Sequence, residues 1–321
     1  MAISEQRDGV DLTNLDEPLG PDAGATKRDL VDYLDAVRDR MLPALADRPL
    51  TVKRVLRGQR PFMQKNAPKY TPDWVRTTPM WAETSHREVH YILCDDRRTL
   101  LWLGNQRAVE YHPTLGLAGD VHRPTHLVLD LDPPGDDFAD VVAVAHLVHR
   151  ALIDCGLEGI PKTSGAKGIH VFVPIDAAPV DDVAAATRAL AARVEALDPD
   201  IATTAFIVED RDGKVFVDST RAGGATVAAA YSPRLLPGTP VSFPLRWSEL
   251  DDVTPADFTV HTAPAALAGR PSWTESMPAP QHLPADLVEQ GRTIPVARVA
   301  AMHEGKRRKR AARVSEARDG G

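Results

Sequence analysis

The chain has 321 residues, of which 43% are hydrophobic and 26% charged, and its formal net charge is −7 at pH 7. This composition is ordinary for a globular protein, and the length suffices for one large domain or two closely packed lobes. The only cysteines, Cys94 and Cys155, exclude a disulfide framework and a paired-cysteine zinc site, and they fit a reducing cytoplasm. The polar N-terminus lacks the apolar segment of a signal peptide, and no run of residues is long enough to span a bilayer. The negative charge also excludes a surface that is basic throughout.

The first 25 residues predict an extended or turn-rich lead-in, and Thr26 then begins a helix in which Asp29 completes a capping box. Apolar residues from Leu30 to Leu45 follow at helical spacing. Lys27 lies in the first turn of this helix, where the helix dipole disfavours a cation. Two interpretations remain open: a solvated lysine, or an anion held by Lys27 and the free N–H groups.

The stretch from 48 to 76 is basic although the protein as a whole is acidic. Lys53, Arg54 and Lys65 are among eight basic residues, which face a single acid, Asp73, and alternate with aromatic residues such as Phe62. Basic and aromatic side chains together favour phosphate contact and base stacking, although a solvated basic loop is the alternative. After a predicted strand over 87–94, apolar residues from Leu100 onward predict a short helix that ends at residues 111–113.

The most informative stretch runs from His126 to Pro134. Leucines at 127, 129 and 131 alternate with Val128, Asp130 and Asp132, which predicts a half-buried strand. Side chains two residues apart share one face, so the two carboxylates stand together and resist joint ionisation unless a cation lies between them. Mg²⁺ and Mn²⁺ prefer such oxygen ligands, whereas an acidic pair of this kind can also be plain surface decoration.

A glycine-rich turn follows a predicted helix over 138–155. Residues 162–170 include Ser164, Lys167 and His170 and lead into a strand, so they offer backbone N–H groups, a hydroxyl and an ammonium to a phosphate. The order of residues is not that of a Walker loop, because a strand follows where a helix is required. A purely structural turn is the alternative.

A third acid, Asp218, ends a predicted strand that follows a helix over 180–197, and Arg221 and Arg234 come soon after it. Three acids beside a phosphate loop and two arginines are the set needed for nucleotidyl transfer. In that chemistry two divalent ions about 3.5–4 Å apart activate a hydroxyl and shield the phosphates, while cationic side chains hold the triphosphate.

These motifs, in this order, resemble the archaeo-eukaryotic primase superfamily, and most closely the polymerase domain of bacterial ligase D, which serves nonhomologous end joining. The resemblance covers roughly residues 11–260 and rests on Asp130-Leu131-Asp132-Pro133, on the Ser164 to His170 loop and on Asp218 with Arg221. It implies an α/β (α+β) primase-polymerase fold in which a mixed central β-sheet forms the catalytic module with flanking helices.

The resemblance also implies roles for single residues. Asp130, Asp132 and Asp218 would bind two Mn²⁺ or Mg²⁺ ions, with a preference for manganese and for ribonucleotides over deoxynucleotides as the NTP or dNTP substrate. The triphosphate would lie among His112, Ser164, Lys167, His170, Arg221 and Arg234. The DNA contacts would come from Lys27 at a 5′-phosphate and from Lys53, Arg54, Phe62 and Lys65. Gapped or broken DNA ends would be the partner, with end-joining or other repair proteins beside it, in the cytoplasm at the nucleoid and away from membranes.

On this reading the chain divides into a lead-in (1–25), a catalytic domain (26–300) and a basic, disordered tail (301–321). The catalytic domain would contain a basic lobe (about 26–120), a metal-binding module (about 121–260) and a Pro-rich wrap (about 261–300). The sequence contains no K-x-D-G nucleophile of a ligase, so we expect a stand-alone polymerase homologue that cannot seal a nick.

The chain departs from the family pattern at three places. Glu17 stands where relatives carry a lysine, Met63 follows Phe62 where a second aromatic is usual, and the loop between Arg221 and Ala225 is one residue short. Two other functions remain as alternatives: a DNA-end-binding module without polymerase activity, and a D-x-D phosphatase that uses an aspartyl nucleophile.

Overall fold

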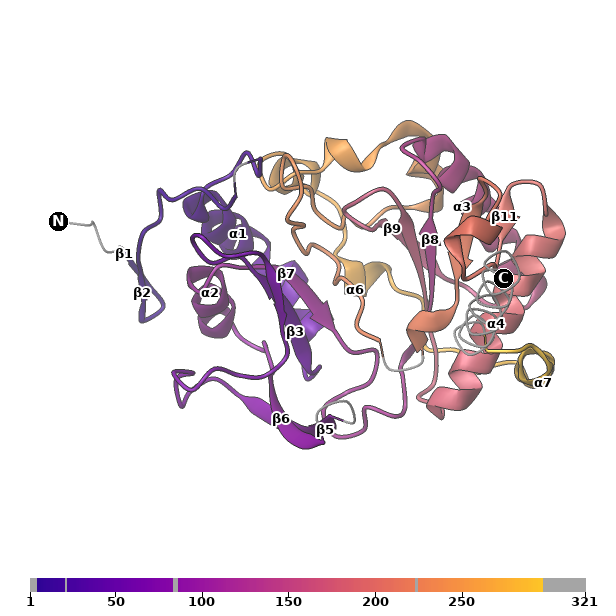
Figure 1. Ribbon diagram of the computed structural model, residues 1–321, viewed down its shortest axis with the longest axis horizontal. Coiled ribbons are helices and arrows are strands. Elements are labelled where there is room, and N and C mark those ends of the chain that lie inside the picture. The colour runs from indigo at the N-terminus through magenta and orange to yellow at the C-terminus, as the bar shows by residue number, and fades with distance from the viewer. Residues whose placement is uncertain (1–4, 21, 83–85, 223–224, 297–321) are drawn as a thin grey trace, which may run out of the picture.

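The computed structural model describes residues 5–20, 22–82, 86–222 and 225–296. Two five-stranded sheets lie beside each other: the N-terminal sheet, with strands between residues 50 and 113, and the C-terminal sheet, with strands between residues 126 and 218 (Figure 1). Their buried residues form one continuous hydrophobic core that also includes Leu12, Leu15 and Leu19 from the N-terminal lead-in. A short hairpin of β1 (Glu5–Arg7) and β2 (Val10–Leu12) begins that lead-in.

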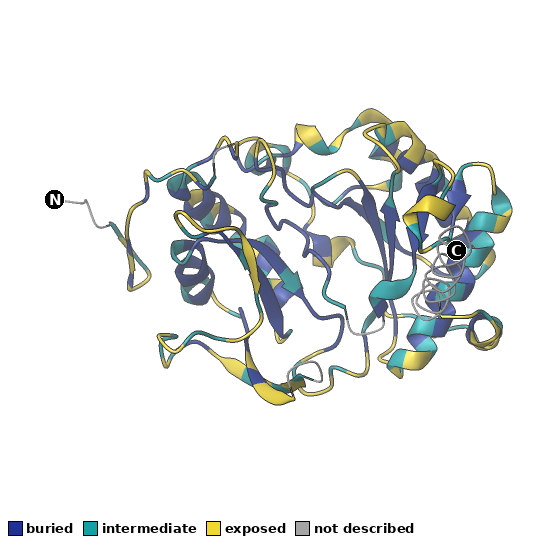
Figure 2. Cartoon of the chain, in the orientation of Figure 1, coloured by how far each residue is buried: buried dark blue, intermediate teal, exposed yellow. Residues whose placement is uncertain are grey.

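The N-terminal sheet places β3 at its centre, where it pairs with β4, β6 and β7. Its strands are β4 (Phe62–Gln64), β3 (Leu50–Arg54), β6 (Arg87–Ile92), β5 (Thr77–Ala82) and β7 (Ala108–Pro113). Helices α1 (Lys27–Leu45) and α2 (Arg97–Asn105) pack against each other beside this sheet (Figure 1). The predicted start of α1 is confirmed, because Thr26 and Asp29 form a capping box. Strands β4 and β5 are largely exposed (Figure 2).

The predicted helix that continues to residues 111–113 is wrong. Helix α2 ends at Asn105, Arg107 takes a left-handed turn with φ of 61°, and residues 108–113 form strand β7. Residues 108–111 of this strand are buried on both faces, so their sequence lacks the alternation that marks a half-exposed strand.

The C-terminal sheet carries the D-x-D motif on its central strand. In order its strands are β11 (Ala202–Thr203), β12 (Val215–Asp218), β8 (His126–Asp132), β10 (Ile169–Pro174) and β9 (Ile160–Thr163). Only β11 and β12 run parallel, so the sheet is mixed, as predicted. Helices α3 (Phe138–Asp154) and α4 (Val180–Leu197) cover the side away from β3 and β7 (Figure 1).

Strand β8 is more deeply buried than its alternating pattern predicts. Leu127, Val128, Leu129 and Leu131 have no exposed surface, because β10 and β12 flank the strand and both of its faces are covered. The prediction of a half-buried strand is therefore wrong, and Asp130 itself is buried.

The segment predicted as a Pro-rich wrap, about 261–300, contains three short helices in its described part. These are α5 (Ala263–Ala266), α6 (Trp273–Ser276) and α7 (Ala285–Thr293), preceded by the 3₁₀ turns η1 (Val208–Asp210), η2 (Thr220–Ala222), η3 (Trp247–Asp252) and η4 (Pro255–Asp257). No helix in the described ranges is both long and apolar enough to cross a membrane. The predicted tail of 301–321 lies outside the described residues.

A buried tyrosine on α1 holds the loop that leads to Arg234. The Tyr33 hydroxyl donates to the Tyr231 carbonyl at 2.7 Å, and the Tyr231 hydroxyl accepts from the Trp273 N–H at 2.7 Å. Tyr231 has a φ of 67°, a conformation that side chains rarely adopt without such support.

We expect Tyr33→Phe to lower the free energy of unfolding by about 1–2 kcal/mol, because it leaves the buried Tyr231 carbonyl without its donor. Urea denaturation measures this change. The control is Tyr111→Phe, because the hydroxyl of this buried tyrosine has no hydrogen-bond partner among the described residues, and we expect a loss below about 0.5 kcal/mol. Equal losses in the two variants would contradict the assignment.

Candidate active site

Three carboxylates meet on two neighbouring strands. Asp130 and Asp132 project from one face of β8, and Asp218, the last residue of β12, lies directly opposite Asp130 in the antiparallel register. One oxygen from each of the three carboxylates lies within 4.8 Å of the others. The meeting follows from the antiparallel register, which pairs Asp218 with Asp130 and Phe216 with Asp132.

One arginine and one histidine contact the carboxylate of Asp130. Arg221 donates to Asp130 through Nε at 2.9 Å and lies 3.4 Å from Asp218, while Nε2 of His170 lies 3.2 Å from Asp130. Burial raises the pKa of Asp130, but His170 and Arg221 outweigh it and hold that pKa well below its usual value. Burial, followed by repulsion from Asp130, raises the pKa of Asp132 to about 7.

The residues present fit a divalent cation. Three clustered carboxylates offer the hard oxygen ligands that Mg²⁺ and Mn²⁺ prefer, and Arg221 alone does not balance their charge. Burial, together with repulsion from Asp130, raises the pKa of Asp132, because protonation also relieves this repulsion. A cation between the three carboxylates would remove that cost.

The glycine-rich loop between β9 and β10 packs directly on β8. A side chain at Gly168 would place a Cβ 2.1 Å from the Leu131 carbonyl oxygen, so only glycine permits this approach. Ser164 Oγ accepts from the N–H groups of Ala166 at 3.2 Å and Gly168 at 3.1 Å, which folds the loop back on itself. The Ser164 carbonyl in turn accepts from Arg234 at 2.6 Å.

Lys162 is a site residue that the sequence reasoning did not single out. Its fully buried ammonium group donates to His170 Nδ1 at 2.8 Å and to Ser242 Oγ at 2.5 Å. Because Nδ1 accepts from Lys162, Nε2 of His170 carries the proton that faces Asp130. Burial, followed by the charge of Lys162, lowers the pKa of His170 to about 4. The only signal in the sequence is a lysine within an otherwise apolar strand.

Glu110 is the second site residue that the sequence analysis did not single out. Its carboxylate contacts three residues that were predicted to bind the nucleotide or DNA. Its Oε1 accepts from Lys53 Nζ at 2.9 Å and from the Leu235 N–H at 3.1 Å. Its Oε2 lies 2.9 Å from His112 Nε2 and accepts from Arg234 Nε at 3.1 Å. Burial opposes ionisation of Glu110, but His112, Arg234 and Lys53 outweigh it and lower the pKa from 4.5 to about 2. Residues 108–113 were predicted to end a helix, and the strand that they form has no alternation, so no pattern in the sequence pointed to Glu110.

The structure thus brings most of the predicted nucleotide residues into two adjoining groups. Asp130, Asp132, Asp218, Arg221 and His170 form the first. In the second, His112 and Arg234 contact Glu110, and Arg234 also contacts the Ser164 carbonyl. Lys167 belongs to neither group, since it is exposed and pairs with Asp136.

The predicted DNA residues differ in exposure. Phe62 and Lys65 are exposed, whereas Arg54 is buried, and its guanidinium donates to Gln106, Gln64 and Tyr70. Lys53 is half-buried and lies opposite Glu110 in the β3–β7 register. Their contact with DNA stays a prediction, and the geometry of Arg54 gives it a supporting position under β4.

Lys27 is buried, so its interpretation as a solvated lysine is wrong. Its ammonium group donates to the Thr13 carbonyl at 2.5 Å, and burial, followed by repulsion from Arg107, lowers its pKa to about 8. Beside it lies a cavity of about 480 Å³ lined by Glu17, Arg57 and Arg107 among others. The Glu17 carboxylate faces Arg107 at 3.4 Å and Arg57 at 3.6 Å.

A cation-binding acidic cluster beside a group of buried basic side chains defines a site for metal-dependent phosphoryl transfer. The sequence matches the family described as LigD, primase-polymerase domain, over residues 26–273, and the chain belongs to this family. Membership makes it a polymerase-type nucleotidyltransferase, as predicted, and removes the phosphatase alternative.

Relatives and a solved structure agree with this assignment. The multifunctional non-homologous end joining DNA repair protein LigD of Mycobacterium tuberculosis is 38% identical over 267 residues, which are 78% of this chain and 34% of that protein. The bifunctional non-homologous end joining protein LigD of Bacillus subtilis is 35% identical over 260 residues, which are 79% of this chain and 41% of that protein. The chain therefore spans only between a third and two fifths of these relatives.

A solved structure matches this fold over most of both chains. The polymerase domain of Mycobacterium tuberculosis ligase D, solved in complex with DNA, matches with a TM-score of 0.77 and 32% identity. The match covers 85% of this chain and 98% of that domain. The predicted primase-polymerase fold is thereby confirmed.

Glu110→Gln keeps the shape of the side chain and removes its charge. Because the folded-state pKa lies below 4.5, the carboxylate contributes its full stability above about pH 4.5 and loses it as the pH falls towards about 2. We expect the variant to be about 2–3 kcal/mol less stable than the wild type near neutral pH, with the difference shrinking below about pH 4.5.

Urea denaturation at a series of pH values measures the difference. Glu289→Gln, at an exposed glutamate on α7, serves as the control and should change stability by less than about 0.5 kcal/mol. A deficit of Glu110→Gln that stays constant from neutral to acid pH would argue against the charge of Glu110 as its cause.

Proposed function

We propose that this protein extends the 3′-hydroxyl of a DNA primer, mainly under direction of a template and also without one, during gap filling or DNA-end repair. The observation that carries the proposal is the cluster of Asp130, Asp132 and Asp218 in a chain of the LigD primase-polymerase family. The relatives named above act in non-homologous end joining, and we assign this chain to the same kind of repair.

Asp130, Asp132 and Asp218 would hold two divalent ions, manganese by preference or magnesium. Such ions lower the pKa of a primer hydroxyl and offset the negative charge that develops on the transferred phosphate. Arg221 and His170 fix the orientation of Asp130 from two sides, and one of its oxygens stays within 4.8 Å of an oxygen of each of the other two carboxylates. Lys162 keeps the imidazole of His170 in that orientation.

The second group would receive the triphosphate of a ribonucleotide or deoxynucleotide. His112 and Arg234 are held in place by Glu110, and Arg234 also contacts the loop at Ser164. A triphosphate that enters between Glu110 and the acidic cluster meets prearranged donors, which cost little ordering entropy. Lys167, on the exposed tip of the same loop, can exchange Asp136 for a phosphate oxygen.

DNA would lie along the exposed side of the N-terminal sheet. Phe62 and Lys65 on and beside β4 offer a ring for base stacking and an ammonium for the phosphate backbone, and the guanidinium of Arg54 supports Phe62 from 5.9 Å. We include gapped duplexes, broken ends and end-joining proteins among the partners, and a preference for ribonucleotides, on the strength of the family resemblance.

Asp130→Asn should reduce primer extension on a gapped duplex with Mn²⁺ at least about a hundredfold, because it removes a ligand of the cation that offsets transition-state charge. Single-nucleotide extension with ribo- and deoxynucleotides measures the effect. Asp39→Asn, at an exposed acid of α1, is the matched control and should keep wild-type activity. Extension by Asp130→Asn at the wild-type rate would refute the metal assignment. DNA binding by an inactive wild type would favour the end-binding module instead.

A second experiment concerns the 5′-phosphate on the downstream strand of a gap. Glu17 adds a carboxylate to the cavity beside Lys27 and occupies Arg107 and Arg57, so we expect the 5′-phosphate to raise gap-filling activity by less than about twofold. Glu17→Lys should enlarge the gain to about fivefold or more, since it replaces repulsion by a charge-assisted contact. Glu88→Lys, on the exposed strand β6, controls for added positive charge. A strong phosphate effect in the wild type would contradict the prediction.

A further inference from the structure

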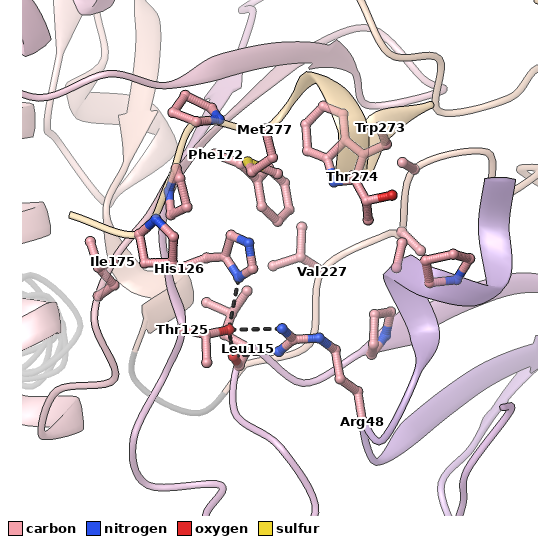
Figure 3. A pocket seen from close by; sticks show the side chains of 18 of the residues that line it. Arg48, Leu115, Thr125, His126, Phe172, Ile175, Val227, Trp273, Thr274 and Met277 are labelled. Carbon is pink, nitrogen blue, oxygen red and sulfur yellow. Dashed lines mark hydrogen bonds between the residues drawn. The ribbon is translucent and has the colours of Figure 1, made fainter. Parts of the chain in front are cut away.

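A cavity of about 660 Å³ lies between the two halves of the molecule, apart from the candidate active site. It is lined by residues from the end of α1, the end of β7, the start of β8, β10 and α6. Figure 3 shows side chains that line it. None of the predicted metal, nucleotide or DNA residues lines it. His126 contributes to its wall four residues before Asp130, which is about 13 Å along the strand. The volume lies within the range of about 300–1,000 Å³ that is typical of sites for small organic molecules.

The walls of this cavity are apolar and partly aromatic. Phe172 and Trp273 meet edge to face with ring centroids 5.4 Å apart, and Leu115, Val227 and Met277 complete the surface (Figure 3). Residues at the rim such as Thr274 and Asp176 are exposed, so the cavity is open to solvent. The Asp176 carboxylate is paired with His282 at 3.0 Å.

One end of the cavity is polar and carries a positive charge. Arg48 donates to the Leu115 carbonyl at 2.6 Å and to Thr125 Oγ at 2.7 Å, and the same hydroxyl lies 2.9 Å from His126 Nδ1 (Figure 3). Among the described residues no carboxylate lies within ion-pair distance of Arg48. Burial lowers the pKa of Arg48 to about 10 with no acid to counter it. Burial, then the charge of Arg48, lowers the pKa of His126 to about 3, so the imidazole is neutral.

An uncompensated cation beside an apolar cavity favours one class of ligand. Arg48 is half-buried, and a charge partly withdrawn from water is costly unless an opposite charge or several hydrogen bonds offset that cost; only neutral oxygens do so here. A single positive charge matches a monoanion better than a phosphate dianion, and the Phe172–Trp273 wall suits a flat ring.

We propose that this cavity binds an organic monoanion, an aromatic carboxylate, with its charged head at Arg48, Thr125 and His126 and its ring against Phe172 and Trp273. The ligand bridges α1 and β7 of the N-terminal half and β8 and β10 of the C-terminal half. The site is independent of the proposed polymerase function.

The probe is 6-fluoro-2-naphthoate, followed by ¹⁹F NMR as the full-length protein is added, with the matching neutral alcohol, 6-fluoro-2-naphthalenemethanol, in a parallel titration. We expect the carboxylate to bind at least about tenfold more tightly than the alcohol, as one charge-assisted contact requires. Arg48→Met, which keeps an apolar chain of similar length, should weaken carboxylate binding about tenfold or more.

Arg188→Met is the matched control. Arg188 is also partly buried, donates to a carbonyl, that of Gly291, and does not line the cavity, so binding should stay within about twofold of the wild type. Ala44→Phe tests the cavity without touching Arg48, because a ring at this lining position on α1 fills the space and should abolish binding.

Each outcome of these binding experiments either supports or overturns the proposed site. Discrimination between acid and alcohol, together with loss in Ala44→Phe, supports the site even if Arg48→Met proves unfolded by circular dichroism. Equal affinities for the acid and the alcohol, wild-type binding by a folded Arg48→Met or by Ala44→Phe, or no binding at about 10 mM probe would each overturn it.

Discussion

Repulsion among three clustered carboxylates, two of them buried, is the constraint around which the C-terminal sheet is arranged. Asp130 lies on the central strand of that sheet, where the cost of an unpaired charge is several kcal/mol. The surrounding residues reduce this cost in steps: Arg221 returns from the turn after β12, and His170 faces Asp130 from β10. Burial and the remaining repulsion raise the pKa of Asp132, and a divalent cation between the carboxylates would relieve that repulsion.

Around Glu110 the arrangement of charge is the opposite, because one buried carboxylate is surrounded by basic side chains. Glu110 is a buried anion whose oxygens are held by Lys53, His112 and Arg234, so its charge is fully paired. Arg234 links this centre to the glycine-rich loop, and Lys162 links the loop strand to His170. A site that orders an acidic cluster and a basic group side by side suits a substrate that brings both metal ions and phosphates.

The two halves of the molecule are joined by more than the chain between them. Tyr33 on α1 fixes the loop at Tyr231, from which Arg234 extends to Glu110 on β7. The cavity at Arg48 lies in the same junction and is lined by residues of both halves. Support for the nucleotide site therefore comes from side chains that are distant in sequence, and the junction is the part of the fold where a small ligand would meet both halves.

The sequence by itself determined the elements that depend only on a few neighbouring residues. The capping box at Thr26, the D-x-D strand and the glycine that allows close approach at Gly168 each follow from a few neighbouring residues, and the order of these motifs was enough to recognise the family. The tertiary structure decided what depends on distant partners. Strand β7 was predicted as a helix end because a strand buried on both faces has no alternation, and the burial of Lys27 could not be predicted because its partner Thr13 lies in the lead-in. Glu110 and Lys162 could not be found from the sequence, since their roles come from a strand register and from burial that only the assembled sheets create.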